Sequence, residues 1–551
     1  MLIPSLFKKY QRTFIIATIF AFSIFAQSVL FHYLIYHEIL FSSLWTHTED
    51  FIRFYLPHTS IALFLAGFVF LFRNKWWTVA VSVFINVWIL ANLWYYRTNG
   101  IMVDQYAFQM IGNLNGFLDS IIALIRPADF AFIGLTIILT ICIIVTKDKE
   151  KNIKISITLI VLGVFLGFTN GLLLVRKHSG DISYLNPLKK IVHHYVEDYS
   201  VIHLLVLTTK EYLMLNNEEK YILTEQEESK INNFLNLSTT SIKSNKTLIL
   251  CIIESLNSFV ITKEIMPNLQ SFIDTSNHVL YCNKMTSQIK SGGSSDGQLI
   301  IISGLLPLEN GAACYRFCFN NYPTISHVYD SSLIILPHAK HVYNQGRMNS
   351  AYGITNCFEK QSDNDKELFK ITIQQSNYYN MVMMLTISTH MPYTSYADSS
   401  HIDISNTIPK TLQNYIKSVN VLDQGMAKLF DAISSDEHLK NATIVITSDH
   451  RMPVPSNENF DNAYNYSRFI PLFIYSPEIK QKTLVTDTCY QMDIYPTILH
   501  LIGCEDYYWK GFGVNLLDST ARHNRPITPE EAYDLSDKLI RADYFKNYDK
   551  Q

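Results

Sequence analysis

The chain has 551 residues, of which 48% are hydrophobic and only 17% are charged, whereas soluble proteins carry about 25% charged residues. The formal net charge of −3 argues against a nucleic-acid partner, which favours a basic face. The shortage of charge lies in the first third of the sequence, so length and composition together predict a membrane part followed by a soluble part.

Five apolar stretches in the first third each come close to the length that a helix needs to cross a bilayer. The first is too long for the apolar region of a signal peptide, lacks a small-residue cleavage site and is followed by further spans, so we expect it to stay uncleaved. This pattern predicts a transmembrane domain of five helices. The stretches cover residues 14–34, 55–72, 76–95, 128–145 and 155–175.

Lysines and arginines in the short loops predict the orientation of this domain, because cytoplasmic loops carry an excess of them. Basic residues precede the first span, occupy the turn between the second and third, and occupy the loop between the fourth and fifth. All three places lie on the cytoplasmic side if the N-terminus is inside. Five crossings then predict a multi-pass protein of the cytoplasmic membrane with its catalytic domain on the extracytoplasmic side.

From residue 246 onward, short apolar runs rich in β-branched residues alternate with helical patterns. The runs at 247–253, 381–387 and 442–447 are nearly continuous, as are strands of a parallel sheet that is buried on both faces. Residues 411–433 have helical periodicity. The pattern predicts an α/β fold with a mostly parallel sheet.

The composition changes along the chain predict four segments. Residues 1–180 are expected to form the transmembrane domain. Residues 181–245, which contain the acidic and polar stretch NNEEKYILTEQEESK, are expected to form a juxtamembrane helical linker. The catalytic domain is expected over residues 246–520, followed by a C-terminal tail over residues 521–551.

Candidate functional residues follow the three predicted strands directly. Glu254 follows the first strand, His390 the second, and the pair Asp449 and His450 the third. In open α/β sheets the ligand site lies beyond the carboxyl ends of the strands. One such residue alone is usually a helix cap or a loop residue, but three strand ends that all deliver ligand-type side chains predict a common site.

The segment SGGSSDG at residues 291–297 precedes an apolar helical pattern. Glycines let the backbone approach a ligand closely, and the N-terminus of a helix favours a phosphate group. Ser294 and Ser295 offer hydroxyls there. The same pattern also suits an ordinary turn with a Ser or Asp helix cap.

Two carboxylates, an imidazole and a hydroxyl oxygen form a hard ligand set for one divalent cation, and zinc and manganese both suit it. A metal ion at a serine oxygen would favour the deprotonated hydroxyl, which can attack phosphorus and form a covalent phosphoserine. His390 is expected to orient the phosphate or to protonate the leaving group. These residue types predict metal-dependent transfer of a phosphoryl-containing group.

Eight motifs occur in order between residues 246 and 520: LILCIIESLNSFV, KEIMPNLQSF, GGSSDGQ, SGLLPL, LTISTHMPYT, VITSDH, FIPLFIYSP and QMDIYPTILHLIG. The series resembles the lipoteichoic acid synthase family of the alkaline-phosphatase/sulfatase superfamily, which also carries five N-terminal spans. The resemblance implies that Glu254, Asp449 and His450 bind a metal ion, typically manganese. It also implies that Ser294 is the nucleophile and a metal ligand, and that His390 binds the headgroup.

The nucleophile position departs from the family pattern, because the family usually has threonine where this chain has Ser294. Both side chains offer a hydroxyl, and the register leaves Ser295 as the alternative. The sulfatase signature C/S-x-P-x-R, which generates a formylglycine nucleophile, is absent from the sequence. Its absence argues against hydrolysis of sulfate esters.

The substrate-binding stretch departs from the family pattern as well. In the family it ends in aromatic-Asn-Arg, whereas here Tyr343 and Asn344 are followed by Gln345, with Arg347 two residues later as the candidate replacement. His338 matches the histidine of this stretch. The resemblance therefore implies headgroup binding by His338, Tyr343, Asn344 and Arg347, with the identity of the headgroup left open.

We expect a membrane-bound transferase that moves a phosphorylated headgroup, glycerol phosphate or similar, from a phospholipid to an extracytoplasmic glycan or lipid acceptor. Three alternatives remain: a phosphoethanolamine transferase, a phosphodiesterase or phosphatase that hands the group to water, and a non-catalytic membrane scaffold. The sequence leaves open the acceptor, the metal, the oligomeric state and whether Cys314 and Cys318 form a disulfide.

Overall fold

The computed structural model describes residues 3–36, 48–72, 74–99, 102–108, 121–122, 124–145, 153–185, 198–214, 220–236, 242–362, 364–454, 460 and 463–546. The described chain divides into two compact units. The N-terminal unit comprises described residues up to 108 and from 121 to 214. The C-terminal unit comprises residues 220–546.

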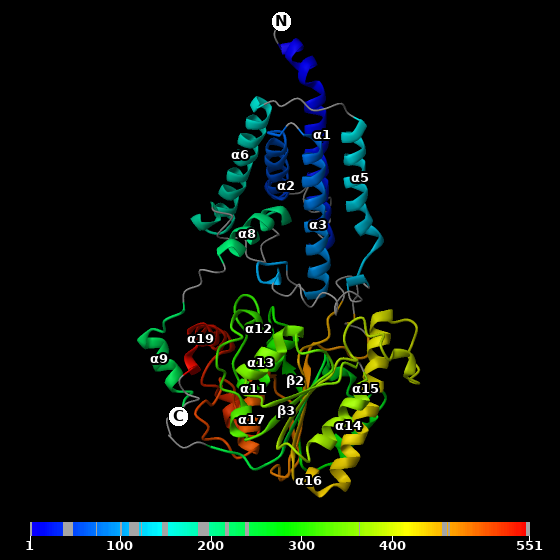
Figure 1. Cartoon of the computed structure of the whole chain (residues 1–551), viewed down its shortest axis with the longest axis vertical. Helices are drawn as coiled ribbons and strands as arrows, with labels where there is room; N and C mark the ends of the chain where they lie inside the picture. Colours follow the sequence, from blue (N-terminus) through cyan, green and yellow to red (C-terminus); the bar gives the residue numbers. More distant parts are fainter. Residues whose placement is uncertain are drawn as a thin grey trace. The chain divides into compact units, whose positions relative to one another are not determined.

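The N-terminal unit is helical (Figure 1). Apolar side chains from several of its helices form one buried cluster. Buried polar side chains add links between them: the carboxylate of Asp129 accepts two hydrogen bonds from the Arg97 guanidinium, at 2.7 and 2.8 Å. The longer helices are α1 (Ile3–Tyr36), α2 (Thr48–Val69), α3 (Lys75–Asn99), α5 (Phe130–Val145), α6 (Ile153–Lys177) and α8 (Val201–Met214).

Four described helices are long and apolar enough to cross a membrane, not the five that the sequence predicts. They are Phe14–Tyr36, Lys75–Arg97, Pro127–Val145 and Ile153–Lys177. The second expected span is a shorter apolar helix, Phe54–Val69, inside α2. The first two turns of α2 carry Glu, Asp and Arg, and at about 1.5 Å per residue the apolar remainder is shorter than a hydrocarbon core of about 30 Å.

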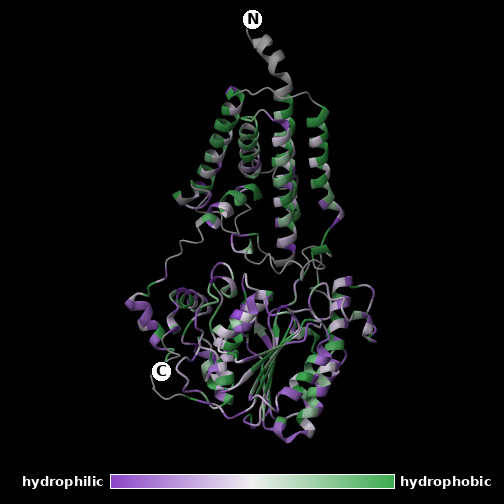
Figure 2. Cartoon of the chain, in the orientation of Figure 1, coloured by the Kyte–Doolittle hydropathy of each residue, from purple (hydrophilic) through white to green (hydrophobic). Residues whose placement is uncertain are grey.

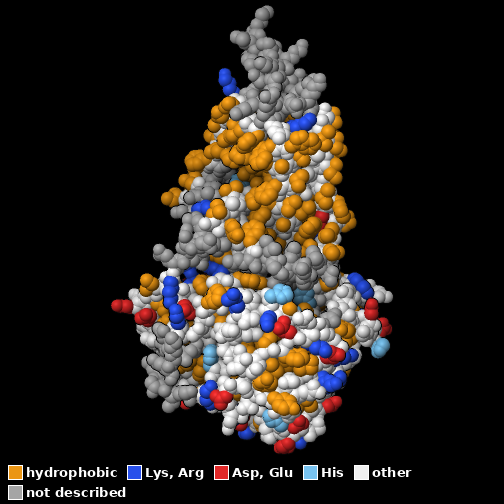
Figure 3. Space-filling model, viewed as in Figure 1, with side chains coloured by type: hydrophobic (Ala, Val, Ile, Leu, Met, Phe, Trp, Pro, Cys, Tyr) orange, Lys and Arg blue, Asp and Glu red, His pale blue; other side chains and the backbone are white. Residues whose placement is uncertain are grey.

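Large apolar side chains remain exposed along these helices. On α5, for example, Ile137, Ile138 and Ile141 are each more than half exposed. Figure 2 shows mostly hydrophobic colouring on α5 and much of α6, and Figure 3 shows many apolar side chains on the visible face of the N-terminal unit. A surface of this kind suits the hydrocarbon of a bilayer and not water.

The C-terminal unit is built on a mixed, mostly parallel sheet of nine strands among the described residues, in the order β4-β3-β5-β1-β6-β7-β2-β8, with β9 beside β2. All pairings are parallel except those of β7 with β6 and β2. The strands are β1 (Leu248–Ile253), β2 (Val279–Thr286), β3 (Ser332–Leu336), β4 (Asn356–Glu359), β5 (Met381–Leu385), β6 (Thr443–Ser448), β7 (Ile470–Tyr475), β8 (Thr483–Val485) and β9 (Cys489–Tyr490).

The three predicted strands are neighbours in the middle of this sheet, as β5, β1 and β6. Every residue of β1 and β6 is buried, which explains why these runs carry no polar alternation. The predicted helix at residues 411–433 is α15 (Lys410–Ser435). The α/β class and the mostly parallel sheet are thereby confirmed.

Helices cover both faces of the sheet (Figure 1). α14 (Asp365–Gln375) and α15 lie on one face, and α11 (Ser294–Ser303) and α17 (Ile494–Leu501) lie on the other. The remaining helices are α9 (Glu225–Asn232), α10 (Pro267–Thr275), α12 (Ala313–Arg316), α13 (Gln345–Ala351), α16 (Glu437–Lys440), α18 (Ser519–His523) and α19 (Pro529–Ala542).

The segment expected as a C-terminal tail is part of this unit over its described residues. The apolar face of α19 is buried, and Leu535, Leu539 and Ile540 belong to the same core cluster as residues of β1 and α11. The hydroxyl of Tyr533 donates a hydrogen bond to the carbonyl oxygen of Gln288, just ahead of α11. The last described helix therefore packs behind the segment that leads to Ser294.

Asp365 at the start of α14 fixes the loop that follows β5. Its carboxylate accepts hydrogen bonds from the backbone N–H groups of Ile387, at 3.2 Å, and Ser388, at 3.0 Å. The side chain is buried. His390 follows Ser388 by two residues, so the carboxylate of Asp365 helps to fix the backbone position of His390.

We predict that Asp365→Ala lowers the free energy of unfolding of the C-terminal unit by about 1–3 kcal/mol, because two backbone donors lose their acceptor in a buried site. Thermal denaturation of the detergent-solubilised chain measures the effect. Glu367→Ala, on the exposed side of the same helical turn, is the control and should leave the melting temperature nearly unchanged. Equal destabilisation by both variants would contradict this role of Asp365.

Candidate active site

The ends of the adjacent strands β1 and β6 bring three functional side chains together. Ile253 and Ser448 are register partners at the ends of these strands, so the residues that follow, Glu254 and Asp449, lie side by side. One ligand atom from each of Glu254, Asp449 and His450 lies within 4.8 Å of the others. The Nε2 atom of His450 is 3.6 Å from Oε1 of Glu254 and 3.5 Å from Oδ2 of Asp449.

Hydrogen bonds hold one oxygen of each carboxylate. Oδ1 of Asp449 accepts from the backbone N–H groups of Ser255, at 2.9 Å, and His450, at 2.6 Å. Oε1 of Glu254 accepts from the Ser255 hydroxyl at 2.6 Å, and the backbone N–H of Glu254 donates to Oγ1 of Thr386 at 2.9 Å. The carboxylates are therefore held in place by their own loops and by the end of β5.

Ser294 is the hydroxyl that meets this cluster. It is the first residue of α11, and its Oγ atom lies 3.2 Å from Oε2 of Glu254 and 3.3 Å from Nε2 of His450. The hydroxyl of Ser295 instead donates to the carbonyl oxygen of Gly292 at 2.8 Å. The geometry therefore favours Ser294 over Ser295 as the nucleophile.

Glycines and one aspartate shape the segment that presents Ser294. Gly293 has φ of 55°, a backbone conformation that residues with a Cβ atom rarely adopt. Oδ2 of Asp296 accepts from the backbone N–H groups of Lys290, at 3.0 Å, and Gly292, at 2.9 Å, and closes the turn. Burial raises the pKa of Asp296 to about 6, although these backbone donors oppose the rise.

The two carboxylates lie in a site where both cannot easily remain ionised. Burial and, after it, the charge of Glu254 raise the pKa of Asp449 to about 7. Burial also acts to raise the pKa of Glu254, but the charges of His450 and His390 hold it below its usual value. Burial lowers the pKa of His450, and the two carboxylates more than offset this and raise it. When both carboxylates are ionised, one protonated imidazole leaves the cluster with a net negative charge.

The three histidines of the site share one arrangement. The Nδ1 atom lies at 2.8 Å from a carbonyl oxygen in His450, at 2.7 Å in His390 and at 3.1 Å in His338, and each time the carbonyl belongs to the following residue. A carbonyl can only accept, so Nδ1 carries the proton and donates it. Whenever such a ring is neutral, its lone pair is on Nε2, which in His450 is the atom next to Glu254 and Asp449.

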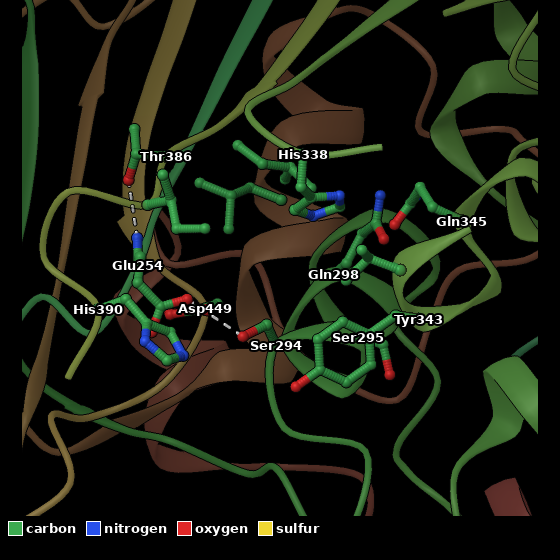
Figure 4. A pocket seen from close by; sticks show the side chains of 14 residues that line it. Glu254, Ser294, Ser295, Gln298, His338, Tyr343, Gln345, Thr386, His390 and Asp449 are labelled. Carbon is green, nitrogen blue, oxygen red and sulfur yellow. Dashed lines mark hydrogen bonds between the residues drawn. The ribbon is translucent and has the colours of Figure 1, made fainter. Parts of the chain in front are cut away.

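A cavity of about 130 Å³ extends from this cluster. Glu254, Ser294, His390 and Asp449 line one part of it (Figure 4). His338, Tyr343, Gln345 and Gln298 line the other part, where Figure 4 shows the imidazole and the two amides grouped together. The first part is the predicted catalytic centre, and the second is space beside it for a headgroup.

The cavity brings together only some of the residues expected to bind the headgroup. His338 and Tyr343 line it, whereas Asn344 and Arg347 are not among its described lining residues. The amide of Asn344 donates to the carbonyl oxygen of Cys314 at 3.0 Å, and the guanidinium of Arg347 lies 4.6 Å from the ring centre of Phe319.

Gln345 lines the cavity in place of a cation. Tyr343 and Asn344 both adopt positive φ, of 50° and 55°. This tight turn brings Gln345 inward as the first residue of α13, and Arg347 lies exposed further along the same helix. Neither Cys314 nor Cys318 is in a disulfide.

Sequence reasoning missed Thr386, Gln298 and Gln345. Thr386 directly follows β5, so the rule that finds Glu254 and Asp449 also finds Thr386 once the end of the strand is placed at Leu385. Gln298 is one helical turn after Ser294, a spacing that places both side chains on one face of α11. Gln345 had no such signal, because its place depends on the positive-φ turn before it.

The residues present fit a divalent cation. Within the described part of the chain, Glu254, Asp449 and His450 are the residues whose ligand atoms come close enough to share one ion, and Ser294 adds a hydroxyl oxygen. Carboxylate, imidazole and hydroxyl donors suit zinc and manganese. A divalent cation would also supply the positive charge that the buried carboxylates lack.

Two family models match the chain. Residues 4–180 match the lipoteichoic acid synthase N-terminal domain, and residues 320–504 match the sulfatase family. The second match includes His338, His390, Asp449 and His450. The two matches cover the apolar helices and most of the sheet, respectively.

Curated relatives align along most of the chain. Lipoteichoic acid synthase 2 of Bacillus subtilis (strain 168) is 24% identical over 88% of this chain and 80% of its own length. Lipoteichoic acid synthase of Staphylococcus aureus (strain USA300) is 23% identical over 87% of this chain and 80% of its own length.

A solved structure is similar along both units. The integral membrane protein lipooligosaccharide phosphoethanolamine transferase A from Neisseria meningitidis matches with a TM-score of 0.55 and 13% identity, over 88% of this chain and 95% of its own. At this identity the likeness concerns the fold. The family models and the curated relatives show a lipoteichoic-acid-synthase-like phosphotransferase of the alkaline-phosphatase/sulfatase superfamily.

Proposed function

We propose that the protein is a metal-dependent transferase that moves a phosphorylated headgroup from a phospholipid to an extracytoplasmic glycan or lipid through a covalent phosphoserine at Ser294. Glu254, Ser294, Asp449 and His450 would hold one divalent cation, with manganese preferred and zinc as the alternative. The transmembrane domain (1–180) and the linker (181–245) would anchor the catalytic domain, from residue 246 onward, outside the cytoplasmic membrane.

One observation carries this proposal: the hydroxyl of Ser294 lies within 3.3 Å of both a carboxylate and an imidazole of a buried metal-type cluster. A serine at the N-terminus of a helix of this length also meets backbone N–H groups that favour an incoming phosphate. A bound divalent cation would lower the proton affinity of the serine oxygen and neutralise charge that develops on the phosphoryl oxygens.

The first half of the reaction forms a bond between Oγ of Ser294 and phosphorus and breaks the bond from phosphorus to the diacylglycerol oxygen. The Ser294 hydroxyl donates its hydrogen bond to Oε2 of Glu254, which would take the serine proton while a lone pair of Oγ attacks phosphorus from the cavity side. His390 would deliver a proton from Nε2 to the departing diacylglycerol oxygen, since its Nδ1 proton is held by the carbonyl of Met391.

The second half reverses these steps with a new alcohol. An acceptor hydroxyl gives its proton to Nε2 of His390 and attacks phosphorus. The bond to Oγ of Ser294 breaks, and Glu254 returns the proton to Oγ, which restores the serine and the protonated histidine. Water in place of the acceptor gives hydrolysis by the same steps. The proposed enzyme therefore differs from a phosphodiesterase only in what occupies the acceptor position.

Phosphoethanolamine is the second candidate headgroup, and the cavity beside Ser294 is the reason to keep it. The position after Tyr343 and Asn344 holds the neutral amide of Gln345, and no Lys or Arg is among the described lining residues. The described lining residues therefore offer no guanidinium to bind a glycerol phosphate. Mass spectrometry of lipids after incubation with mixed phospholipids distinguishes the two donors.

We predict that Ser294→Ala lowers the rate of diacylglycerol release from labelled phosphatidylglycerol by at least about 10³-fold, because the nucleophile is lost. Ser294→Thr keeps the hydroxyl and should stay within about tenfold of the wild-type rate. Chromatographic assay of labelled diacylglycerol from the reconstituted full chain measures both. A Ser294→Ala variant that turns over at the wild-type rate would exclude the phosphoserine.

Removal of the metal should abolish turnover, and added manganese or zinc should restore it, because the cation supplies the charge that the buried carboxylates lack. Glu254→Gln should reduce both the metal content of the purified protein and its activity by at least about tenfold, since one anionic ligand becomes neutral. Glu264→Gln, on the exposed surface, is the control and should change neither. Full activity of a chelator-treated, metal-free protein would contradict the proposal.

The cavity geometry predicts unequal effects at two neighbouring positions of α13. Gln345→Ala should raise the KM for the lipid donor by about fivefold or more, because a side chain that lines the cavity loses its polar group. Arg347→Ala should leave KM within about twofold, because that side chain stacks on Phe319. A larger KM effect at Arg347 would show that Arg347 binds the headgroup instead.

A further inference from the structure

Gln491 joins the loop that carries Asp449 to the segment that leads to Ser294. It is the first residue of the short helix η9 (Gln491–Asp493) and is fully buried. Its Nε2 atom donates to the backbone carbonyl oxygen of Asp449 at 2.7 Å and to that of Ser448 at 3.2 Å. Its Oε1 atom accepts from the backbone N–H of Gln288 at 3.1 Å. Both ends of this side chain are therefore bonded, each to a different functional segment.

A second hydrogen bond links Gln288 to η9. Its Oε1 atom accepts from the backbone N–H of Met492 at 2.9 Å, so Gln288 and η9 are linked in both directions. Gln288 is six residues ahead of Ser294, and its carbonyl oxygen accepts the hydroxyl of Tyr533 in α19. The start of the nucleophile segment is thus tied to η9 and to the last helix.

Gly297 closes the other side of the Asp449 backbone. A Cβ added at Gly297 would lie 2.8 Å from the Cα of Asp449, which is closer than real Cβ atoms approach. The first turn of α11 therefore contacts Asp449 directly, and the amide of Gln491 bonds the carbonyl of the same residue. Between them, the two contacts fix the distance from Asp449 to the helix that begins at Ser294.

We propose that Gln491 is a positioning residue that holds the backbone of Asp449 against α11, and that it thereby sets both the affinity of the site for a divalent cation and the turnover of the enzyme. The turnover part rests on the proposed function, whereas the metal part does not depend on the substrate. Groups that hold metal ligands in place typically change metal affinity by roughly 10- to 100-fold when they are mutated.

The test uses Gln491→Met, which keeps the length of the side chain and removes its polar atoms. Manganese affinity of the detergent-solubilised full chain is measured by competition with a fluorescent chelator, and kcat and KM are measured with phosphatidylglycerol. We expect the manganese Kd to rise by roughly 10- to 100-fold and kcat to fall. KM should change little, because Gln491 is not among the described residues that line the cavity.

Gln413→Met is the matched control. Gln413 is also buried, and its Nε2 atom donates to a backbone carbonyl, that of Ile408, at 2.9 Å. This variant should lose thermal stability without a change in manganese affinity. The proposal is overturned if Gln491→Met binds manganese as the wild type does, or if Gln413→Met weakens manganese binding to the same extent.

A second variant keeps the test decisive if Gln491→Met does not fold. Gln491→Asn keeps the amide but shortens the side chain by one methylene, which moves Nδ2 away from the carbonyl oxygen of Asp449, and wild-type manganese affinity in that variant overturns the proposal. A wild-type chain that binds manganese but consumes no phospholipid contradicts the proposed function alone, and the ratio of the manganese affinities still decides the role of Gln491. An active wild type with an unaffected Gln491→Met variant contradicts the role of Gln491 alone.

Discussion

Two carboxylates that lie side by side in a buried site repel each other and lose their hydration, so a fold that keeps both ionised must place positive charge beside them. Glu254 and Asp449 are such a pair, and the register of β1 and β6 leaves them no freedom to separate. His450 provides one imidazole. The rest of the site is consistent with a structure built around the cation that completes the charge.

The surroundings of this pair supply rigidity more than chemistry. Backbone donors hold one oxygen of Asp449, and Thr386 holds the backbone of Glu254. Gly297 lets α11 approach the Asp449 backbone, which brings Ser294 to the cluster. Preorganised groups of this kind need not rearrange during a reaction, and that is where most of the advantage of such a site lies.

The strand pattern and the strand ends were readable from the sequence, because buried parallel strands are continuous apolar runs and their carboxyl ends meet at one edge. Glu254, His390 and Asp449 came from that rule. The end of α2 did not, since the apolar run continues to Phe72 whereas the helix ends at Val69. The choice of Gln345 over Arg347 depends on a positive-φ turn that no motif predicts. Gln491 opens the motif QMDIYPTILHLIG, but its side chain bonds only backbone atoms of other segments, so the motif does not reveal its role.

The most direct measurement is the anomalous scattering of manganese in crystals of the protein grown with that ion. The account predicts one strong peak within bonding distance of carboxylate oxygens of Glu254 and Asp449, of Nε2 of His450 and of Oγ of Ser294. A fully occupied manganese ion elsewhere, with these four side chains unliganded, would contradict it.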